Sequence, residues 1–595
     1  MRSIRIISAG AALNQDIELH ELMRSIAEKS VLMLAKFNQQ PIQLPTFIEK
    51  NAHLLRDYLQ LMMILVKNPE QIRAMYQGYW QAVTELMQHQ LKHWQEGKTM
   101  PLNDKRFSSA EWVNHPFFSA LCQHYLLACE HTNLLLQRVD YDDTHVAKRV
   151  QFFTRQYLDA LSPDNFLHTN PQLLTEIVQT QGRNLLHGLH NLLIDLETDT
   201  SRLNIKMTDT DAFKIGINLA ITPGKVIFRN SLMELIQYTP QTPTVHAVPL
   251  LIIPPWINKY YILDLSPHNS LVRWLVSQGI CVFVISWVNP GRKHANKGIE
   301  DYLHEGPIAA INTIQRQLKS KQINTLGFCI GGTLQAMLIA YYQTVQKNPI
   351  RSATFLAAMI DFSDPGDMSV FIDEQQITTL EKHMSEKGFL EGHVMANTFN
   401  LLRASDLIWS FFIKNYLRAK APVPFDTLYW NADSTNMPAK MHSQYLRWMY
   451  LHNDLVKPGK LHINGTPLDL SNIVMPTFFV GTQRDHIAPW KTTYLGFQLM
   501  RGDKTFLLGG SGHIAGIVNP PSSEKYGFYR NNASPESADD WLAGAAHHQG
   551  SWWPDWLTWL KKQSGQLIGA PELAKLPVRP IMDAPGEYVL EVCEG

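Results

Sequence analysis

The sequence predicts an α/β protein in which a mainly parallel sheet, covered by helices on both faces, is preceded by a mainly helical domain. Residues 1–225 repeat apolar side chains at helical spacing, whereas residues 226–595 alternate short apolar runs with helical segments. Unbroken apolar strands joined by helices are typical of parallel sheets that are buried on both faces. A chain of 595 residues also exceeds the usual size of one domain, so we expect two.

The N-terminal domain, residues 1–225, is expected to consist of helices separated by polar breaks. Apolar residues recur every three or four positions in its helical runs, which cover 54–66, 74–91, 119–136 and 144–161. A polar break at 103–106 and turn chemistry at 162–165 separate these runs.

The second domain, residues 226–595, is expected to hold the sheet. Predicted strands cover 226–228 and 233–238, which form a hairpin or meander, and then 249–253, 281–287, 324–328, 353–359, 476–481 and 505–508. About 110 residues lie between the strands that end near 360 and begin near 475, far more than an ordinary connection. This insertion, about 362–474, is helical and rich in aromatic residues, and it is predicted to be a cap over an active site. A packing subdomain without a gating role is an equal alternative.

The segment Gly327-Phe328-Cys329-Ile330-Gly331 has the form of a nucleophile elbow with cysteine in the central position. The predicted strand leads into it, and a helix-like run, 333–344, leads out. Glycines two residues before and two after Cys329 suit a turn that is too tight for larger side chains. Such a turn exposes the central side chain and directs the N–H of Ile330 at a developing oxyanion. The alternative is a small, inert cysteine after a core strand. The strand–turn–helix context favours the elbow and, with the sheet, predicts an α/β-hydrolase fold.

An acid and a histidine follow the elbow in the chain order that this fold requires. Asp485 lies in the loop after strand 476–481, and His513 follows strand 505–508 in a glycine-rich loop. The 28 residues between them are about the length of one helix and one strand. Both side chains are therefore expected at the sheet edge that carries the elbow. Asp485 alone could be a helix cap and His513 alone a surface histidine, but their joint position favours a catalytic triad with Cys329.

Three further residues are candidates for the same site. The loop after strand 249–253 is expected to supply a second oxyanion donor, which we assign to Ile257. Asn258 in that loop and His486 beside Asp485 are candidates for substrate binding. A loop residue without a role is an equally good interpretation of His486.

The composition excludes several functional classes. The 53 basic and 53 acidic residues give a formal net charge of zero, which argues against a nucleic-acid binder. No segment reaches the roughly 18–20 unbroken apolar residues of a membrane span, and the N-terminus is a poor signal peptide. The five cysteines form no close pair of the metal or redox type, so we predict no metal, no cofactor and a reducing, cytoplasmic location.

Several long and unusual strings resemble the polyhydroxyalkanoate synthases, in particular the single-subunit class I type. In addition to the elbow and the loops around Asp485 and His513, the resemblance rests on Asp104–Phe107, Ser162–Phe166, Pro254–Leu265, Tyr429–Asn436 and Gly550–Trp556. It covers nearly the whole chain from about residue 100, whereas residues 1–100 resemble the family only loosely.

The resemblance implies that the chain polymerises (R)-3-hydroxyacyl-CoA, with (R)-3-hydroxybutyryl-CoA as the expected substrate, and releases CoA. By motif match the nucleophile is Cys329, the acid Asp485 and the histidine His513. It also implies a homodimer that binds the growing polyester and the surface of polyester granules in the cytoplasm.

Cysteine chemistry suits a thioester substrate, because attack by a thiolate gives another thioester. A free thiol is only a few per cent ionised at neutral pH, so a base is useful, and His513 is the expected base. Asp485 either orients His513 or activates the 3-hydroxyl of an incoming acyl unit, and both roles stay open. The competing functions are a cysteine-dependent hydrolase or simple acyltransferase, and a non-catalytic protein that coats polymer granules.

Overall fold

The computed structural model describes residues 18–33, 52–198, 203 and 205–592 of the chain. The chain forms two compact units, one of residues 1–209 with 403–423 and one of residues 210–402 with 424–595. Residues 403–423, which lie inside the predicted cap insertion, therefore belong with the N-terminal helices. The sequence places the domain boundary at 225/226, whereas the compact units divide at 209/210.

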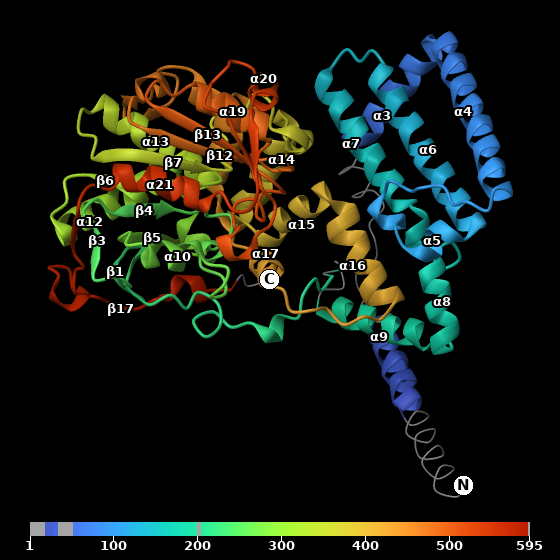
Figure 1. Ribbon diagram of the computed structural model, residues 1–595, viewed down its shortest axis with the longest axis horizontal. Coiled ribbons are helices and arrows are strands. Elements are labelled where there is room, and N and C mark those ends of the chain that lie inside the picture. The colour runs from blue at the N-terminus through green and yellow to red at the C-terminus, as the bar shows by residue number, and fades with distance from the viewer. Residues whose placement is uncertain (1–17, 34–51, 199–202, 204, 593–595) are drawn as a thin grey trace, which may run out of the picture. The chain divides into compact units, whose positions relative to one another are not determined.

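The N-terminal unit is helical, as predicted (Figure 1). Three of the four predicted runs lie within a helix, the fourth, 144–161, extends one residue past its helix, and a further helix covers 18–33. The helices are α3 (Ala52–Lys67), α4 (Pro69–Gln95), α5 (Ala110–Asn114), α6 (Pro116–Arg138), α7 (Thr144–Ala160), α8 (Pro171–Thr180), α9 (Arg183–Thr198) and α16 (Ser410–Phe412), the last flanked by π-helical turns at Ser405–Trp409 and Ile413–Leu417.

Specific contacts bind residues 403–423 to the helices of this unit. The Tyr416 hydroxyl donates to the Asp195 carboxylate at 2.6 Å, and Arg418 pairs with Glu176 at 2.6 Å. The backbone of α9 approaches closely, since a Cβ atom on Gly188 would lie 1.8 Å from the Tyr416 carbonyl oxygen. Side-chain chemistry thus specifies this pairing across more than 200 positions of the sequence.

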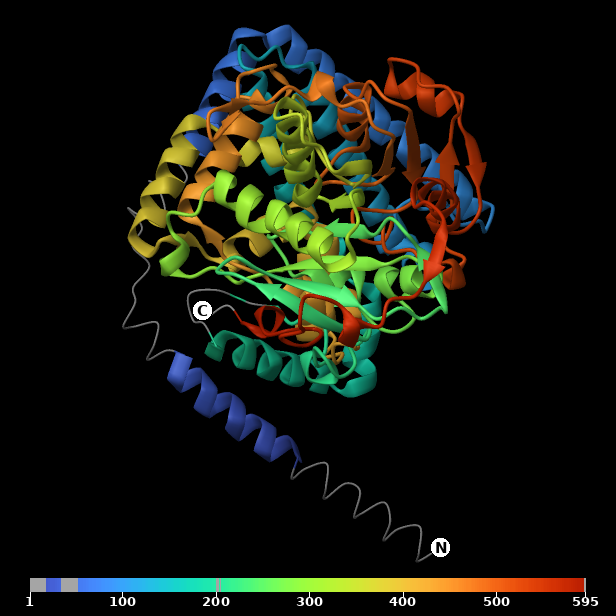
Figure 2. The same ribbon diagram turned by 90° about the vertical axis from the view of Figure 1, so that its left-hand side faces the viewer.

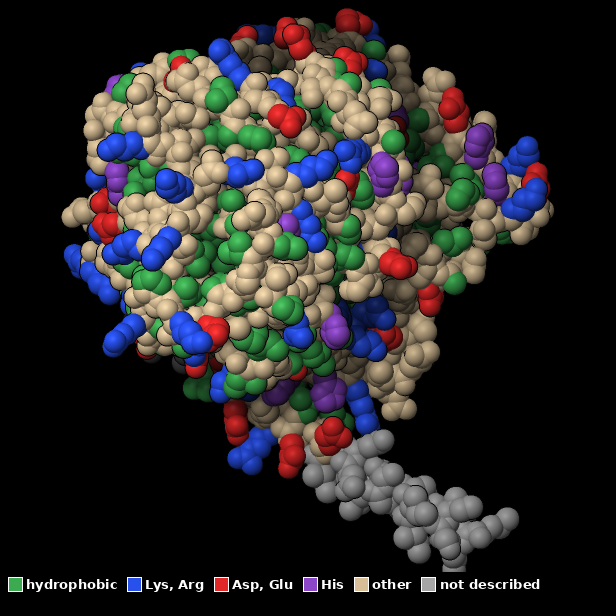
Figure 3. All heavy atoms as spheres, turned by 60° about the vertical axis from the view of Figure 1, so that its left-hand side comes forward, with side chains coloured by type: hydrophobic (Ala, Val, Ile, Leu, Met, Phe, Trp, Pro, Cys, Tyr) green, Lys and Arg blue, Asp and Glu red, His purple; other side chains and the backbone are tan. Residues whose placement is uncertain are grey.

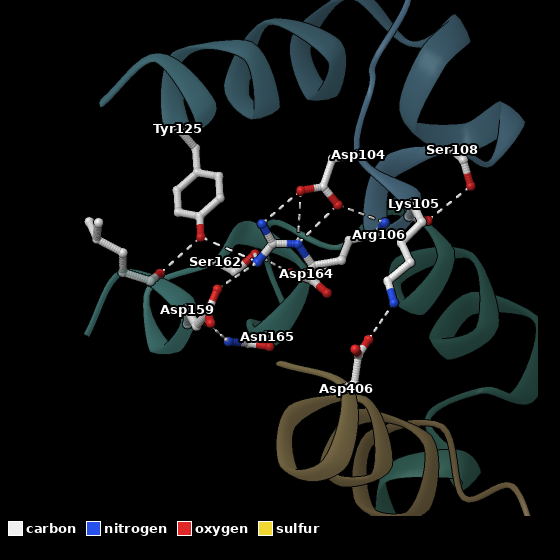
Figure 4. A network of polar contacts seen from close by, with 11 residues as sticks. Asp104, Lys105, Arg106, Ser108, Tyr125, Asp159, Ser162, Asp164, Asn165 and Asp406 are labelled. Carbon is white, nitrogen blue, oxygen red and sulfur yellow. Dashed lines mark hydrogen bonds and ion pairs between the residues drawn. The ribbon is translucent and has the colours of Figure 1, made fainter. Parts of the chain in front are cut away.

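A polar network centred on Arg106 organises the same unit (Figure 4). The guanidinium binds Asp104 at 2.8 Å and Asp159 at 3.2 Å, and it also contacts the hydroxyls of Tyr125 and Ser162. The neighbouring Lys105 pairs with Asp406 at 2.5 Å. One short loop therefore joins α6, the end of α7 and segment 403–423.

The second unit holds an eleven-stranded sheet in the order β15-β14-β13-β12-β7-β6-β4-β5-β2-β1-β17. The strands from β13 to β5 in this order are parallel, and antiparallel strands extend the sheet at both edges. The parallel strands are β4 (Leu250–Ile253), β5 (Val282–Trp287), β6 (Ile323–Phe328), β7 (Ile350–Leu356), β12 (Thr477–Thr482) and β13 (Lys504–Gly509). The antiparallel strands are β1 (Gly224–Arg229), β2 (Met233–Tyr238), β14 (Phe528–Arg530), β15 (Ala546–His548) and β17 (Met582–Asp583).

Helices pack on both faces of this sheet, as predicted (Figures 1 and 2). The core on one face includes side chains of α12 (Ala309–Leu318), α13 (Ile330–Thr344) and α19 (Trp490–Gln498). The core on the other includes α10 (Leu271–Ser277) and α21 (Trp553–Gln563). This is the α/β-hydrolase architecture that the sequence predicts.

Between β7 and β12 the second unit carries the helical cap. Its helices are α14 (Glu374–Lys387), α15 (Gly392–Leu402), α17 (Asp426–Ala432) and α18 (Ala439–Tyr445), the last continued by a π-helical turn at Leu446–Leu451. Smaller elements of the unit are α11 (Ile299–Leu303), α20 (Ala538–Ala543) and the short strands β3 (Thr244–His246), β8 (Phe389–Leu390), β9 (Met437–Pro438), β10 (His462–Ile463), β11 (Thr466–Pro467) and β16 (Leu567–Gly569).

Each predicted strand is present, and the largest difference is at β7. The apolar run predicts a strand as far as 359, but β7 ends at Leu356, because Ala357 adopts a positive φ of 42°. The short strands β14, β15 and β17 are absent from the prediction. They have three residues or fewer, too few for a periodic pattern.

The surface fits the balanced composition. Figure 3 shows Lys and Arg side chains scattered among Asp and Glu on the visible face rather than gathered in one continuous patch. Among the described residues, none of the helices combines the length and apolar character that a membrane crossing needs.

Candidate active site

Cys329 lies in the turn between β6 and α13, where the sequence predicts an elbow. Its backbone has φ 53° and ψ −127°, a conformation that L-residues other than glycine rarely adopt. The turn is crowded, since a Cβ atom on Gly331 would lie 2.1 Å from the Ile253 carbonyl oxygen. A Cβ on Gly327 would lie 2.5 Å from Cα of Gly332. The glycines therefore permit the close approach of β6, α13 and β4 that lifts the cysteine above the sheet edge.

Asp485 follows β12 and is held by a full set of donors. Its side chain is completely buried, and its Oδ1 accepts the backbone N–H groups of Ile487 at 2.9 Å and Ala488 at 2.8 Å. Its Oδ2 accepts the Thr482 hydroxyl at 2.8 Å and His513 Nδ1 at 2.7 Å. Burial alone would raise the pKa of Asp485, but His513 and these hydrogen bonds hold that pKa below its ordinary value. Asp485 is thus a permanently ionised carboxylate at neutral pH.

His513 follows β13 and is oriented from two sides. Its Nδ1 donates to Asp485, and its ring stacks on Phe328 with the centroids 5.5 Å apart. Burial alone would lower the pKa of His513, but the charge of Asp485, the neighbouring Cys329 and the hydrogen bond to Asp485 raise that pKa well above its ordinary value. Because Nδ1 is occupied by Asp485, Nε2 is the ring nitrogen left for Cys329. The structure therefore brings all three predicted triad residues together.

The parallel sheet explains why residues 329, 485 and 513 meet. β6, β7, β12 and β13 run in parallel as neighbours, so their carboxyl ends lie at one edge. Cys329, Asp485 and His513 each follow one of these ends, which is where α/β proteins assemble their sites.

The predicted oxyanion residues lie beside the cysteine. Ile330 is the first residue of α13, where an N–H group has no partner within the helix, and Ile257 lines the same cavity as Cys329. Asn258 donates to the Trp430 carbonyl at 3.4 Å, so its amide holds the loop against the cap. His486 is partly buried beside Asp485, but the cavity is lined by the next two residues, Ile487 and Ala488, rather than by His486.

The cavity over Cys329 is small and mainly apolar. Its volume is ≈ 30 Å³, room for about two water molecules. The cap contributes most of the lining that the sequence did not identify as functional, and Met368, Met395, Phe399, His442, Tyr445, Leu446 and Tyr450 form that part. The aromatic content of the cap is visible in the sequence, but no signal distinguishes His442 or the methionines there. A cavity of this size is too small for an acyl-CoA thioester while the cap lies in this position.

A larger groove of ≈ 400 Å³ lies in the N-terminal unit between α4 and α6. Met87, Leu91 and Trp94 contribute to its lining, and none of the predicted site residues does. We do not place the candidate active site there, because Cys329, Asp485 and His513 lie together in the second unit.

The fold and the site define a protein of α/β-hydrolase architecture with a cysteine at the nucleophile position. Residues 248–520 match the family model of the alpha/beta hydrolase fold, and residues 103–275 match that of the poly-beta-hydroxybutyrate polymerase (PhaC) N-terminus.

The chain belongs to the poly(3-hydroxyalkanoate) polymerase family. It is 44% identical to the poly(3-hydroxyalkanoate) polymerase of Methylorubrum extorquens, over 88% of this chain and 87% of that one. It is 44% identical to the polymerase subunit PhaC of Rhizobium meliloti (82% and 79% covered) and 41% identical to that of Cupriavidus necator (88% and 88% covered). The expected family is thereby confirmed.

Proposed function

We propose that this protein polymerises (R)-3-hydroxyacyl-CoA, mainly (R)-3-hydroxybutyryl-CoA, into a polyhydroxyalkanoate and releases CoA through an acyl thioester on Cys329. The observation that carries the proposal is the assembly of Cys329, His513 and Asp485 at one sheet edge in a chain of this family. The length of the chain favours the single-subunit, class I type of acyltransferase.

Acylation begins when the Cys329 sulfur attacks the carbonyl carbon of the CoA thioester. His513 Nε2 takes the thiol proton, and the raised pKa of His513 allows it to hold that proton beside the thiolate. The oxyanion of the tetrahedral intermediate accepts the N–H of Ile330 and, as a second donor, that of Ile257. The bond from carbon to the CoA sulfur then breaks, and His513 returns the proton to the departing thiolate.

Elongation uses the 3-hydroxyl of a hydroxyacyl unit as the nucleophile. Its oxygen attacks the acyl carbon on Cys329, its proton passes to His513, and the bond from carbon to the Cys329 sulfur breaks. The products are a new ester bond and a cysteine that His513 reprotonates. Because an oxoester replaces a thioester, this step is downhill.

Asp485 acts in this scheme through His513 and not on the hydroxyl itself. Both of its oxygens already accept hydrogen bonds, two from backbone N–H groups, one from Thr482 and one from His513. Its side chain is completely buried and leaves no surface for a substrate hydroxyl. These contacts favour the orienting role over direct activation.

The cap has two consequences for the reaction. The substrate can enter only if the cap moves away from Cys329, because the present cavity is ≈ 30 Å³. Once the cap closes on an acyl group, the apolar lining excludes water, which would otherwise hydrolyse the acyl-enzyme.

The decisive experiment incubates the purified protein with (R)-3-hydroxybutyryl-CoA and follows free CoA and the acyl group together. We expect CoA release with a polyester that can be extracted into solvent. Release of CoA with free hydroxy acid would instead establish a thioesterase, and no release with any acyl length would favour a granule-coat protein.

We also propose that the protein works as a homodimer on the surface of polyester granules in the cytoplasm. Support for binding to an apolar surface comes from exposed apolar side chains on α3 and α4, namely Leu55, Leu59, Met62, Met63, Val66, Tyr76, Trp80, Met87, Leu91 and Trp94. Replacing Trp80, Leu91 and Trp94 with serine should reduce partition onto granules and leave CoA release from soluble substrate unchanged. Replacing the polar Gln81 and Gln88 with serine is the matched control. Light scattering at several concentrations tests the dimer.

A further inference from the structure

His442 is a buried polar residue of the active-site cavity for which the proposed mechanism has no use. It belongs to α18 of the cap, is 2% exposed and lines the cavity together with Cys329. Its Nδ1 atom is buried without a hydrogen-bond partner among the described residues. Buried polar atoms in native proteins nearly always have a partner, so this nitrogen is available to a group that binds in the cavity.

The imidazole of His442 is neutral. Burial lowers its pKa to about 4. At neutral pH one ring nitrogen of His442 therefore carries a proton and the other accepts a hydrogen bond.

Besides His442 and Cys329, the polar side chains of the lining are Thr333, Tyr445 and Tyr450. The Thr333 hydroxyl donates to the Met359 carbonyl at 2.7 Å. The rings of Tyr445 and Tyr450 pack edge to face with their centroids 5.6 Å apart. Much of the remaining lining is aliphatic, methionine or phenylalanine. An acyl group in this cavity thus meets a buried polar atom of the cap, Nδ1 of His442, that no described residue engages.

We propose that His442 recognises the 3-hydroxyl of the acyl unit that is transferred to Cys329, through a hydrogen bond between Nδ1 and that hydroxyl. This inference rests on the proposed function. A hydroxyl both donates and accepts, so it can pair with either tautomer of the neutral ring. An acyl group without the hydroxyl leaves Nδ1 buried and unpaired in the acylated state, which disfavours it. His442 is therefore a specificity residue for hydroxylated acyl groups.

The test compares the rate at which Cys329 is acylated by (R)-3-hydroxybutyryl-CoA and by butyryl-CoA. CoA release in a single turnover and the intact mass of the full-length protein report acylation. For the wild type we expect a preference for the hydroxylated substrate of about 10- to 100-fold. His442→Phe keeps a flat ring but removes the nitrogen. It should abolish the preference, mainly because acylation of Cys329 by (R)-3-hydroxybutyryl-CoA becomes slower.

Two variants distinguish recognition from a packing role. In His442→Asn the side-chain amide can occupy the position of Nδ1, so most of the preference should return. His452→Phe, at an exposed histidine of the same cap, should leave the ratio unchanged. If His442→Phe does not fold, as judged by its thermal melt, His442→Leu compared with His442→Asn gives the same ratio test.

The outcomes separate this inference from the proposed function. If neither thioester acylates Cys329 in the wild type, the proposed function is wrong. If the wild type is acylated and His442→Phe keeps the wild-type ratio, or slows both substrates equally, the proposed function stands and the role of His442 is overturned.

Discussion

Cys329 combines the chemistry of the site with backbone strain. At φ 53° the backbone of a residue that carries a Cβ atom is strained, whereas glycine adopts the same conformation readily. We expect Cys329→Ala and Cys329→Gly both to abolish CoA release, since neither has a nucleophile. Cys329→Gly should nevertheless be more stable than Cys329→Ala by about 1 kcal/mol in chemical denaturation, the reverse of the order at an unstrained position. Measurable turnover in Cys329→Ala would contradict the assignment of the nucleophile.

Asp485 and His513 form a coupled pair whose contribution to stability depends on pH. The folded-state pKa of His513 is raised above its ordinary value of 6.5, so the stabilisation is fully present below that pH and is lost as pH rises through the folded-state pKa. The folded-state pKa of Asp485 is lowered, so its contribution to folding stability is present above its ordinary pKa of 3.8 and is lost as pH falls through the folded-state pKa. The destabilisation caused by Asp485→Asn should therefore be largest near pH 5–6 and shrink toward pH 9.

Thermal melts of the wild type and Asp485→Asn across this range measure the difference. Asp469→Asn is a suitable control, because Asp469 accepts one backbone N–H in a short turn away from the histidine. A difference that grows with pH would show that the pair is not ionised as described.

At the scale of elements, the contact between α13 and the end of β4 determines how far the elbow projects. A methyl group on Gly331 would overlap the Ile253 carbonyl oxygen. Gly331→Ala should therefore separate the two elements, lower the free energy of unfolding by about 3 kcal/mol and reduce CoA release more than 100-fold. Gly569→Ala in β16, where a methyl group meets no atom within 4 Å, should have little effect on either quantity. Equal effects of the two substitutions would contradict the role of this packing.

In the N-terminal unit the Arg106 network joins α6, the end of α7 and segment 403–423. Arg106→Met leaves the carboxylates of Asp104 and Asp159 without their cation in a largely buried position, so we expect a loss of about 2–3 kcal/mol in the unfolding of this unit. Arg73→Met removes a solvent-exposed pair with Glu70 and should change stability by less than about 0.5 kcal/mol. Hydrogen exchange of α6 and α7, measured as denaturant is added, gives the stability of this unit and checks both values.

The comparison of elements also shows what the sequence can predict. β4, β5, β6 and β12 are continuous apolar runs, because both faces of a parallel sheet are buried, and the sequence predicts them within a few residues. β15 is exposed at all three positions and leaves no pattern. The triad is predictable because its residues follow strand ends in a fixed order. His442 is not, since the fold alone determines which cap residues face the cysteine.

At the scale of the whole molecule, the chain passes between its two compact units three times, at 209/210, 402/403 and 423/424. Helical periodicity predicts that 403–423 is helical but not which surface buries it. The partners of this segment are charged and polar groups of α8 and α9, such as Glu176, Asn184 and Asp195. The N-terminal unit is thus incomplete without residues that lie inside the cap insertion.

This interdependence predicts how fragments behave. Residues 210–595 expressed alone would expose the buried side chains Ile413 and Tyr416 and leave Arg418 without Glu176. We expect this fragment to be largely insoluble or inactive in CoA release, and coexpression with residues 1–209 to restore soluble, active protein. Tyr416→Ala in the fragment pair should weaken that restoration, whereas Ser410→Ala, at an exposed position of the same segment, should not. Full activity of 210–595 alone would mean that the N-terminal helices are dispensable for the cap and the site.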